Sequence, residues 1–120
     1  MEKEKIDDML RVYIQQIDQQ NAETVADFLD ENFRVVIPNF NKTNSNLVLS
    51  REQYLNMIKE KRVGGTKRTI DVRFIEHEKE MAIVSLITKN EHMTMRSYLN
   101  LSKKNDSWLV VNDMPEITNH

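Results

Sequence analysis

The spacing of the hydrophobic residues changes once along this chain, and that change restricts the folds that it can adopt. Up to about residue 60, most hydrophobic residues recur at steps of three and four, as Leu10, Ile14 and Ile17 do, which is typical of one face of an α-helix. From Thr69 onward they alternate with polar residues, which is typical of β-strands. Helices grouped early and successive strands grouped late predict an α+β domain, with the helices on one face of a curved sheet.

Capping and turn residues divide the chain into elements. Ser50 and Gln53 have the spacing of a capping box at a helix start, and Pro38 ends the β-branched run before it. The pair Gly64–Gly65 marks a break before the strand-rich part. The expected helices cover residues 3–19, 21–29 and a third segment that begins at 50, and the expected strands cover 33–37, 47–49, 69–77, 81–88, 93–102 and 107–114. We find no linker between these elements, so residues 1–120 are expected to form a single domain.

The composition of the chain excludes several classes of protein. The chain has no cysteine, which excludes disulfides and thiolate metal sites, and 120 residues are enough to bury a core without them. Residues 1–8 carry too many charges for a signal peptide, and no hydrophobic run approaches the roughly 20 residues that cross a bilayer. We therefore expect a cytoplasmic protein that makes no contact with a membrane.

The charge is distributed unevenly. Residues 59–68 contain five basic residues and one acidic residue, whereas the whole chain has a net charge of −2. Such a segment can attract an anion or an acidic partner, and the sequence leaves that question open. No aromatic residues are interleaved with the basic ones and the chain is acidic overall, so we do not expect binding to nucleic acid.

The residues that usually hold metals and cofactors show no suitable pattern. The three histidines, His77, His92 and His120, have neither helix-face spacing nor a tight metal motif. The glycine pair lacks the Gly-Lys-Ser/Thr sequence of a phosphate-binding loop. We expect neither a metal site nor a bound cofactor.

The expected strand over 81–88 is hydrophobic on both faces in its middle. Val84 and Leu86 alternate with Ile83 and Ile87, whereas a sheet covered on one side only should carry polar residues on the other. No further helix is available to cover the second face. We therefore expect a homodimer that forms through the outer face of the sheet.

Two segments resemble the nuclear transport factor two-like superfamily, and within it the small bacterial SnoaL-like and lumazine-binding-like domains. The first runs from Leu10 to Pro38 and ends in Phe-x-Val-x-x-Pro; the second runs from Tyr98 to Asn112 and contains Leu-x-Lys-x-x-Asp-x-Trp-x-Val-x-Asn. The resemblance implies a cone-shaped, cystatin-like α+β fold, in which N-terminal helices pack on a curved, mostly antiparallel sheet. It also implies a pocket at the wide end and dimers formed through the outer sheet face. The superfamily includes both enzymes and binding domains, so the fold does not select a function.

The chain also resembles the ketosteroid isomerase branch of that superfamily. Tyr13 falls where this branch has the phenol that binds the oxyanion, and Ser97 falls near the position of its protonated aspartate. The aspartate that acts as general base is replaced by Ile37, which cannot accept a proton. We therefore do not expect this isomerase reaction, and we assign no catalytic residue.

The resemblance and the alternation of strand residues together suggest a ligand site. Asn112 shares the alternation of Trp108 and Val110, which predicts that its amide projects into the pocket. The predicted polar contacts are Tyr13 as hydroxyl donor, Ser97 and Asn112; the predicted hydrophobic walls are Ile37, Phe40, Tyr54, Ile58 and Met95.

Three functions remain open after these assignments. The first is a non-catalytic domain that binds a small, partly hydrophobic molecule or serves as an accessory module. The second is an enzyme of the cyclase, dehydratase or isomerase type with an unrecognised acid–base pair, for example Tyr13 with His92. The third is a domain that docks another protein through its sheet face and its basic segment. A cavity filled by the protein's own side chains would favour the third.

Overall fold

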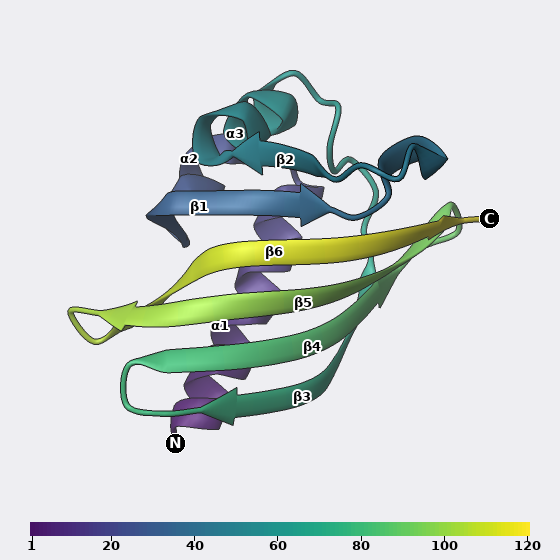
Figure 1. The fold of residues 1–120 in the computed structure, drawn as a ribbon. Helices are drawn as coiled ribbons and strands as arrows, with labels where there is room; N and C mark the ends of the chain where they lie inside the picture. The colour runs from purple at the N-terminus through teal and green to yellow at the C-terminus, as the bar shows by residue number, and fades with distance from the viewer.

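Six strands form one curved sheet, and three helices lie on its inner side (Figure 1). The computed structural model describes residues 1–120. The helices are α1 (Glu2–Asp18), α2 (Ala22–Ala26) and α3 (Arg51–Lys59), with a short 3-10 turn, η1, over Phe40–Lys42. The strands are β1 (Leu29–Ile37), β2 (Leu47–Ser50), β3 (Thr69–His77), β4 (Met81–Lys89), β5 (Met93–Lys104) and β6 (Ser107–Asn119). These elements confirm the predicted α+β class.

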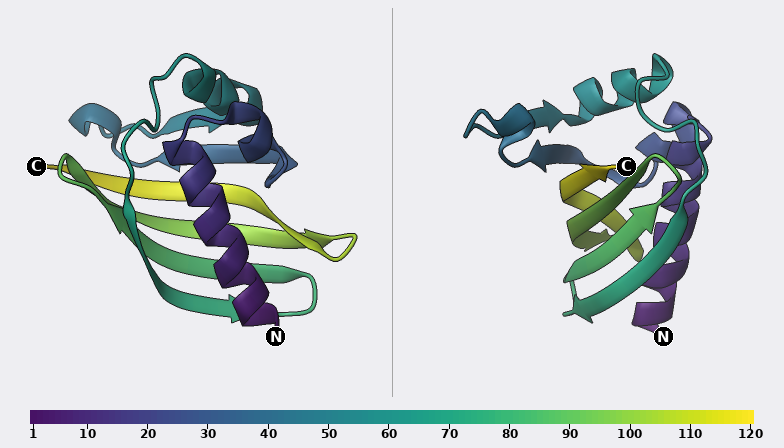
Figure 2. Two further views of the ribbon diagram at one scale, coloured as in Figure 1. Left: turned by 180° about the vertical axis from the view of Figure 1, so that it is seen from behind. Right: turned by 90° about the vertical axis from the view of Figure 1, so that its right-hand side faces the viewer.

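The sheet has the order β2-β1-β6-β5-β4-β3. All neighbouring strands are antiparallel except β1 and β6, which are parallel. Helix α1 crosses the inner face of β3–β6, and the sheet bends so that β1, β2 and α3 lean over the end of α1 (Figure 2). Because of this curvature, the first half of α1 packs closely on the sheet, whereas the end of the fold near the C-terminus of α1 is more open. None of the three helices combines the length and the hydrophobicity that a bilayer crossing needs.

The two ends of α1 are fixed by different contacts. At its N-terminus, Glu2 Oε2 accepts hydrogen bonds from Trp108 Nε1 at 2.7 Å and from Lys103 Nζ at 3.3 Å. At its C-terminus the α3–β3 loop passes very close, because a Cβ atom on Gly64 would lie 2.1 Å from the backbone oxygen of Ile17. Gly64 also has a φ of +84°, which glycine adopts without strain. The predicted break at the glycine pair is therefore confirmed, and this break places the loop against α1.

The capping box predicted at the start of α3 is confirmed. The Ser50 hydroxyl accepts a hydrogen bond from Gln53 N, and the Gln53 side chain accepts one from Ser50 N. Two strand boundaries were predicted wrongly. Strand β1 begins at Leu29, four residues before the predicted Phe33, because Leu29 pairs with Val110 of β6. Residues 30–32 were expected to end the preceding helix, but the pairing of β1 with β6 includes them in the strand.

Strand β6 is also longer than predicted, because it continues through Pro115 to Asn119. Its pairing with β1 ends at Asp113, so from Pro115 onward β6 has β5 as its only neighbour. Proline is tolerated on such an edge, where its missing N–H leaves no ladder bond unmade. Two residues of this extension, Pro115 and Ile117, line the cavity described below.

A β-bulge in β6 changes which residues face inward. Leu101 pairs with Val110 and Asn100 pairs with Asn112, so Val111 has no partner on β5. One extra residue shifts the alternation by one and moves every later side chain to the other face. Asn112 therefore points away from the inner face, and Asp113 takes the inward position that the sequence assigned to Asn112.

The hydrophobic core lies between α1 and the inner face of the sheet. It contains 19 buried residues, including Ile6 and Leu10 of α1, which have no exposed surface. Val84, Leu86 and Leu99 meet them from the sheet. This half of the fold is filled, so any space for a ligand lies beyond Tyr13, toward the C-terminus of α1.

Candidate functional site

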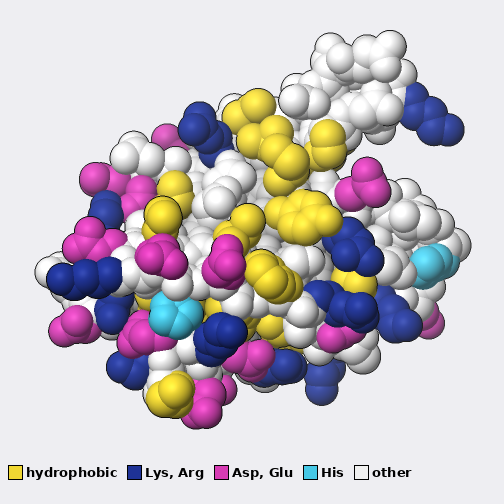
Figure 3. Space-filling view, turned by 60° about the horizontal axis from the view of Figure 1, so that its bottom comes forward, with side chains coloured by type: hydrophobic (Ala, Val, Ile, Leu, Met, Phe, Trp, Pro, Cys, Tyr) yellow, Lys and Arg dark blue, Asp and Glu magenta, His cyan; other side chains and the backbone are white.

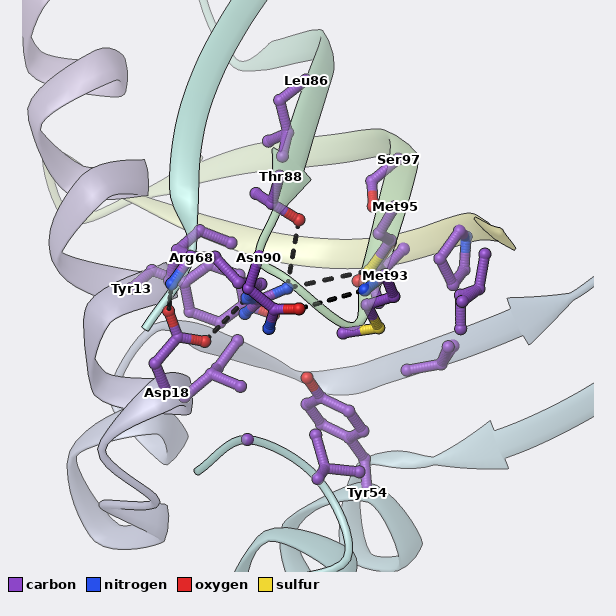
Figure 4. Close-up of a pocket in the computed structure, with 18 of the residues that line it drawn as sticks. Tyr13, Asp18, Tyr54, Arg68, Leu86, Thr88, Asn90, Met93, Met95 and Ser97 are labelled. Atoms are coloured by element: carbon purple, nitrogen blue, oxygen red, sulfur yellow. Dashed lines mark hydrogen bonds and ion pairs between the residues drawn. The ribbon is translucent and has the colours of Figure 1, made fainter. Parts of the chain in front are cut away.

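A cavity of about 370 Å³ lies between the second half of α1, α3, the α3–β3 loop and the inner face of β4–β6 (Figure 4). Twenty-four residues line it, and 14 of them are hydrophobic. Four lining residues, Gly64, Thr66, His92 and Ile117, are exposed and mark its mouth. The volume and the hydrophobic lining are typical of a site for one small organic molecule.

The hydrophobic walls come from every surrounding element. Ile14 and Ile17 line the cavity from α1, Leu86 from β4, and Met93 and Met95 from β5. The remaining hydrophobic lining residues are Val35, Ile37, Leu49, Met57, Val63, Leu99 and Ile117, with Tyr13 and Tyr54, and Pro115 lies beside them. Methionine side chains adapt to ligands of different outline, so the β5 side of the cavity forms a soft wall.

A buried ion pair lies on one side of the cavity. Arg68 Nε donates to Asp18 Oδ1 at 2.7 Å and the Arg68 backbone N–H donates to Asp18 Oδ2 at 3.0 Å. The Arg68 Nη1 group also donates to Thr88 Oγ1 at 3.2 Å and approaches the sulfur of Met95 (Figure 4). The side chains of Arg68 and Asp18 are only 7% and 6% exposed. Both carboxylate oxygens have partners, so this pair is complete without a ligand.

Two phenols reach the cavity from the helices. Tyr13 of α1 is 1% exposed and its hydroxyl has no hydrogen-bond partner, although the Tyr54 side chain of α3 lies beside it. Burial raises the pKa of Tyr13 well above its usual value, and the neighbouring Tyr54 and Asp113 raise it further. Burial also raises the pKa of Tyr54. Both phenols therefore stay protonated at neutral pH and can donate hydrogen bonds.

Asp113 supplies a carboxyl group from β6. Part of the residue is exposed, but its Oδ1 atom is buried and has no hydrogen-bond partner. Burial raises the pKa of Asp113 to about 7, against the opposing effects of the Arg68 charge and the neighbouring Ser97 hydroxyl. Close to neutral pH this group is therefore present both as a carboxylic acid, which can donate, and as a carboxylate, which accepts.

The structure brings together five of the eight residues that the sequence suggested for the site. Tyr13, Ile37, Tyr54, Met95 and Ser97 all line the cavity. In Figure 4 the hydroxyl of Tyr54 is directed toward the space that Met95 and Ser97 border from the sheet side. Their contact with a ligand stays a prediction.

The other three suggested residues lie outside the cavity. Phe40 lies in η1, where positive φ angles at Asn39 and Asn41 turn the chain and leave the ring 38% exposed. Ile58 has no exposed surface and packs in the core, whereas its neighbour Met57 lines the cavity. Asn112 faces outward because of the bulge at Val111.

Sequence reasoning missed the three charged residues of the site. Asp18 had a visible signal, because it lies four residues after Ile14 on the hydrophobic face of α1. Arg68 gave none, since it is one of five basic residues in a segment that is otherwise exposed. Asp113 gave none either, because no glycine or proline marks the bulge at Val111.

The histidines are not part of the inner site. His92 lies at the mouth with its side chain 69% exposed, 3.5 Å from Glu91 Oε1, whereas Tyr13 is buried. No group of three or more His, Asp or Glu side chains lies close enough to hold a metal ion. The polar side chains that line the cavity away from its mouth are therefore two phenols, hydroxyls, the Asn90 amide, the Asp113 carboxyl and the Asp18–Arg68 pair.

Comparison with known proteins gives one family match and many similar folds. A family model described as "Putative lumazine-binding" matches residues 1–114. None of the curated proteins is a significant match. Among solved structures, an NTF2-like protein from Cytophaga hutchinsonii has a TM-score of 0.84 at 13% identity, with 98% of this chain and 99% of that chain covered.

Two further solved structures cover nearly the whole chain. An NTF2-like protein of unknown function from Silicibacter pomeroyi has a TM-score of 0.83 at 12% identity, covering 98% of this chain and 96% of that one. A ketosteroid isomerase-like protein from Erwinia carotovora atroseptica has a TM-score of 0.75 at 10% identity, covering 94% and 93%. Identities this low show a shared fold and carry no activity over.

Proposed function

Because the chain belongs to the putative lumazine-binding family and has the nuclear transport factor two-like fold, we propose that it binds a small, partly hydrophobic molecule in the cavity without converting it. The predicted superfamily and fold are thereby confirmed. The observation that carries the proposal is the cavity itself, which has a volume of about 370 Å³ and mostly hydrophobic walls. A cavity of this size and lining fits one small organic molecule.

A binding role is favoured over isomerase chemistry by the residue at the end of β1. Ile37 occupies the position of the general base in the ketosteroid isomerase branch, and it lines the cavity. An aliphatic side chain cannot take a proton from a bound substrate. Binding without conversion needs no such base.

Binding is tested by native mass spectrometry of the freshly purified protein, followed by thermal-shift screening against pteridines, flavins, steroids and aromatic polyketides. A retained small adduct, or a raised midpoint with one compound class, supports the proposal. The matched variants are Leu86→Trp, which fills the cavity from β4, and Val48→Trp on the exposed β2. The first should abolish the adduct or shift and the second should leave it. If no adduct or shift occurs with the unmodified protein, the binding role is wrong.

One observation favours an enzyme as a second candidate. A cavity carboxyl with a pKa of about 7, that of Asp113, can exchange a proton with a substrate near neutral pH, and Tyr13 can stabilise a developing oxyanion. The test is mass spectrometry of a bound compound after incubation in D₂O. Carbon-bound deuterium that depends on Asp113 supports the enzyme. A compound recovered unlabelled supports binding alone.

The outer face of the sheet supports a second part of the proposal, a homodimer. Phe74, Tyr98 and Met114 lie in one cross-strand row that also includes Ser85, and they are 52%, 50% and 39% exposed. Ile83, beside this row, is 42% exposed. Figure 3 shows hydrophobic side chains gathered over the middle of a face with charged side chains around them. Exposed hydrophobic patches of this kind are typical of interfaces between proteins.

The surrounding charges suit a second copy of the chain. The adjacent cross-strand row contains Asp71, Ile87, Arg96 and Glu116, so both signs of charge border the patch. A face that carries both signs can pair with itself across a two-fold axis. We therefore propose a dimer with the cavities on the far sides of the two sheets.

The dimer is tested by sedimentation of the unmodified protein and of Tyr98→Lys. Tyr98→Lys places a charge in the middle of the row and should yield a monomer. Val48→Lys, an equally exposed site on β2, is the control and should leave the dimer intact. A monomeric unmodified protein at micromolar concentration would contradict the dimer.

A further inference from the structure

The polar side chains that line the cavity present few hydrogen-bonding atoms to a ligand. Asp18, Arg68 and Thr88 bond to one another, and Thr88 has no exposed surface. Tyr13 Oη and Asp113 Oδ1 are buried, so they contribute little to the surface that a ligand meets. A ligand with many donors and acceptors would lose its hydrogen bonds to water here and find few replacements.

Two polar side chains lie closer to the mouth. Asn90 Oδ1 already accepts hydrogen bonds from His92 N at 2.8 Å and from Met93 N at 3.1 Å, which closes the β4–β5 turn. The Tyr54 hydroxyl is directed toward the space between α3 and the sheet (Figure 4). One polar group on a ligand is enough to bond this hydroxyl.

The charges of the site are not free to pair with an ionised ligand. Arg68 Nε lies 2.7 Å from Asp18 Oδ1, so these two side chains neutralise each other. The positive charge of Arg68 also acts on Asp113, which weakens the attraction of that carboxyl for a cation. Lys67 and Lys89 are exposed and do not line the cavity. A charged ligand would lose hydration without gaining a partner, so the cavity favours an uncharged one.

Methionines and tyrosines line the cavity from both the helices and the sheet. Three of the seven methionines of the chain line it, Met57 from α3 and Met93 and Met95 from β5. The rings of Tyr13 and Tyr54 line it from α1 and α3. Methionine sulfur makes favourable contacts with aromatic rings, and two aromatic rings attract each other beyond the effect of their buried area. These walls therefore favour an aromatic ligand over a saturated one of the same outline.

The volume of the cavity limits the ring system. At about 370 Å³ it lies near the lower end of the range of roughly 300–1,000 Å³ that is typical of small-molecule sites. Resting on the proposed function, we infer that the ligand is an uncharged aromatic compound of two or three fused rings with at most one polar group. Its rings lie against Met57, Met93 and Met95, and its polar group faces the Tyr54 hydroxyl.

The test uses four compounds that share two fused six-membered rings. They are 2-naphthol, which fits the inference; trans-decahydro-2-naphthol, its saturated counterpart; 2-naphthoate, which is an anion; and lumazine, which carries several donors and acceptors. Dissociation constants are measured at pH 7 by calorimetry with the unmodified protein. We expect 2-naphthol to bind at least about tenfold more tightly than 2-naphthoate and lumazine. It should also bind several-fold more tightly than the saturated alcohol, although burial of hydrophobic surface alone does not favour it.

Variants separate the sulfur contacts from the flat shape of the aromatic ring. The double variant Met93→Leu with Met95→Leu keeps hydrophobic side chains of similar volume and removes two sulfur atoms. It should reduce the preference for 2-naphthol over the saturated alcohol several-fold. Met81→Leu, on β4 with 63% of the residue exposed, is the matched control and should leave the preference unchanged. A preference that persists in full in the double variant would show that the rings do not lie against these methionines.

The outcomes distinguish this inference from the proposed function. If the saturated alcohol, 2-naphthoate or lumazine binds the unmodified protein as tightly as 2-naphthol, the uncharged aromatic class is wrong and the cavity still binds small molecules. The same holds if none of the four binds but another compound of the wider screen raises the thermal midpoint. If none binds and the wider screen also gives no shift, both conclusions are wrong.

Discussion

Two polar clusters in the same cavity differ in how completely their atoms are paired. Around Arg68, both oxygens of Asp18 accept hydrogen bonds and Thr88 accepts a third from the guanidinium. Around Asp113, the carboxyl Oδ1 and the Tyr13 hydroxyl have no partner. The first cluster ties the α3–β3 loop to α1 and β4, so its role is structural. Unpaired buried groups cost stability, so the second cluster lowers the stability of the fold whereas the first one raises it.

The largest expected effect comes from breaking the paired cluster. Arg68→Ala leaves the Asp18 carboxylate buried without its partner, which should lower the free energy of unfolding by about 3–5 kcal/mol in urea titrations. Arg73→Ala is the control, because its ion pair with Asp71 is more than half exposed and should contribute less than about 1 kcal/mol. Equal losses in the two variants would show that the buried pair does not hold the loop.

The next effect concerns the unpaired carboxyl and depends on pH. Burial raises the pKa of Asp113 to about 7 in the folded protein, from about 4 in the unfolded chain. The folded state therefore holds the proton more tightly, so this group favours folding below about pH 4 and loses that advantage as the pH rises to 7. Asp113→Asn removes the charge and should stabilise the protein more at pH 8 than at pH 5, by roughly 3 kcal/mol.

This pH effect is measured by chemical denaturation of the unmodified protein and Asp113→Asn at both pH values. Glu52→Gln, on the exposed surface of α3 and outside every ion pair, is the control and should change stability equally at pH 5 and pH 8. If Asp113→Asn raises the free energy of unfolding equally at both pH values, the Asp113 carboxyl is not desolvated in the folded protein.

A smaller loss should follow from Thr88→Val. Thr88 has no exposed surface, and the change keeps its shape while it removes the acceptor for Arg68 Nη1. A hydrogen bond to a charged group contributes about 1.5–3 kcal/mol, so we expect a loss in this range. Thr94→Val, on the outer side of β5, removes an exposed hydrogen bond to His120 and should cost less than about 0.5 kcal/mol. Equal losses of stability in the two variants would show that the Thr88 hydroxyl does not contribute to the cluster around Arg68.

The smallest expected effect is that of Tyr13→Phe in the absence of a ligand. The hydroxyl has no partner, so its removal leaves no group newly unpaired and relieves the cost of burying it. We expect the free energy of unfolding to stay within about 0.5 kcal/mol of the original or to rise slightly. A loss above about 1 kcal/mol would show that the hydroxyl is already bonded within the protein.

The difference between the clusters also explains what the sequence could predict. Tyr13 follows from the periodicity of α1, and Met95 and Ser97 follow from the alternation of β5, which has no bulge before Asn100. Local periodicity decides these positions. It also decides the element order and the fold class, apart from the strand boundaries at Leu29 and Asn119.

The remaining site residues depend on contacts between distant parts of the chain. Asp113 faces inward because of an unmarked bulge at Val111. Arg68 is buried because the loop before it must pass Gly64 against the carbonyl of Ile17. Neither contact has a local sequence signal, so the spacing of residues did not single out Arg68 within the basic segment 59–68 and placed Asn112 in the cavity.

The most direct test of the account is a two-dimensional ¹H–¹⁵N NMR titration of the unmodified protein with the compound that raises its thermal midpoint most. The account predicts saturable shifts at residues that line the cavity, strongest near Tyr13, Ser97 and Asp113, with small changes on the outer sheet face near Tyr98. Saturable shifts confined to the outer face, or no shifts at all, would contradict the claim that the cavity is a ligand site.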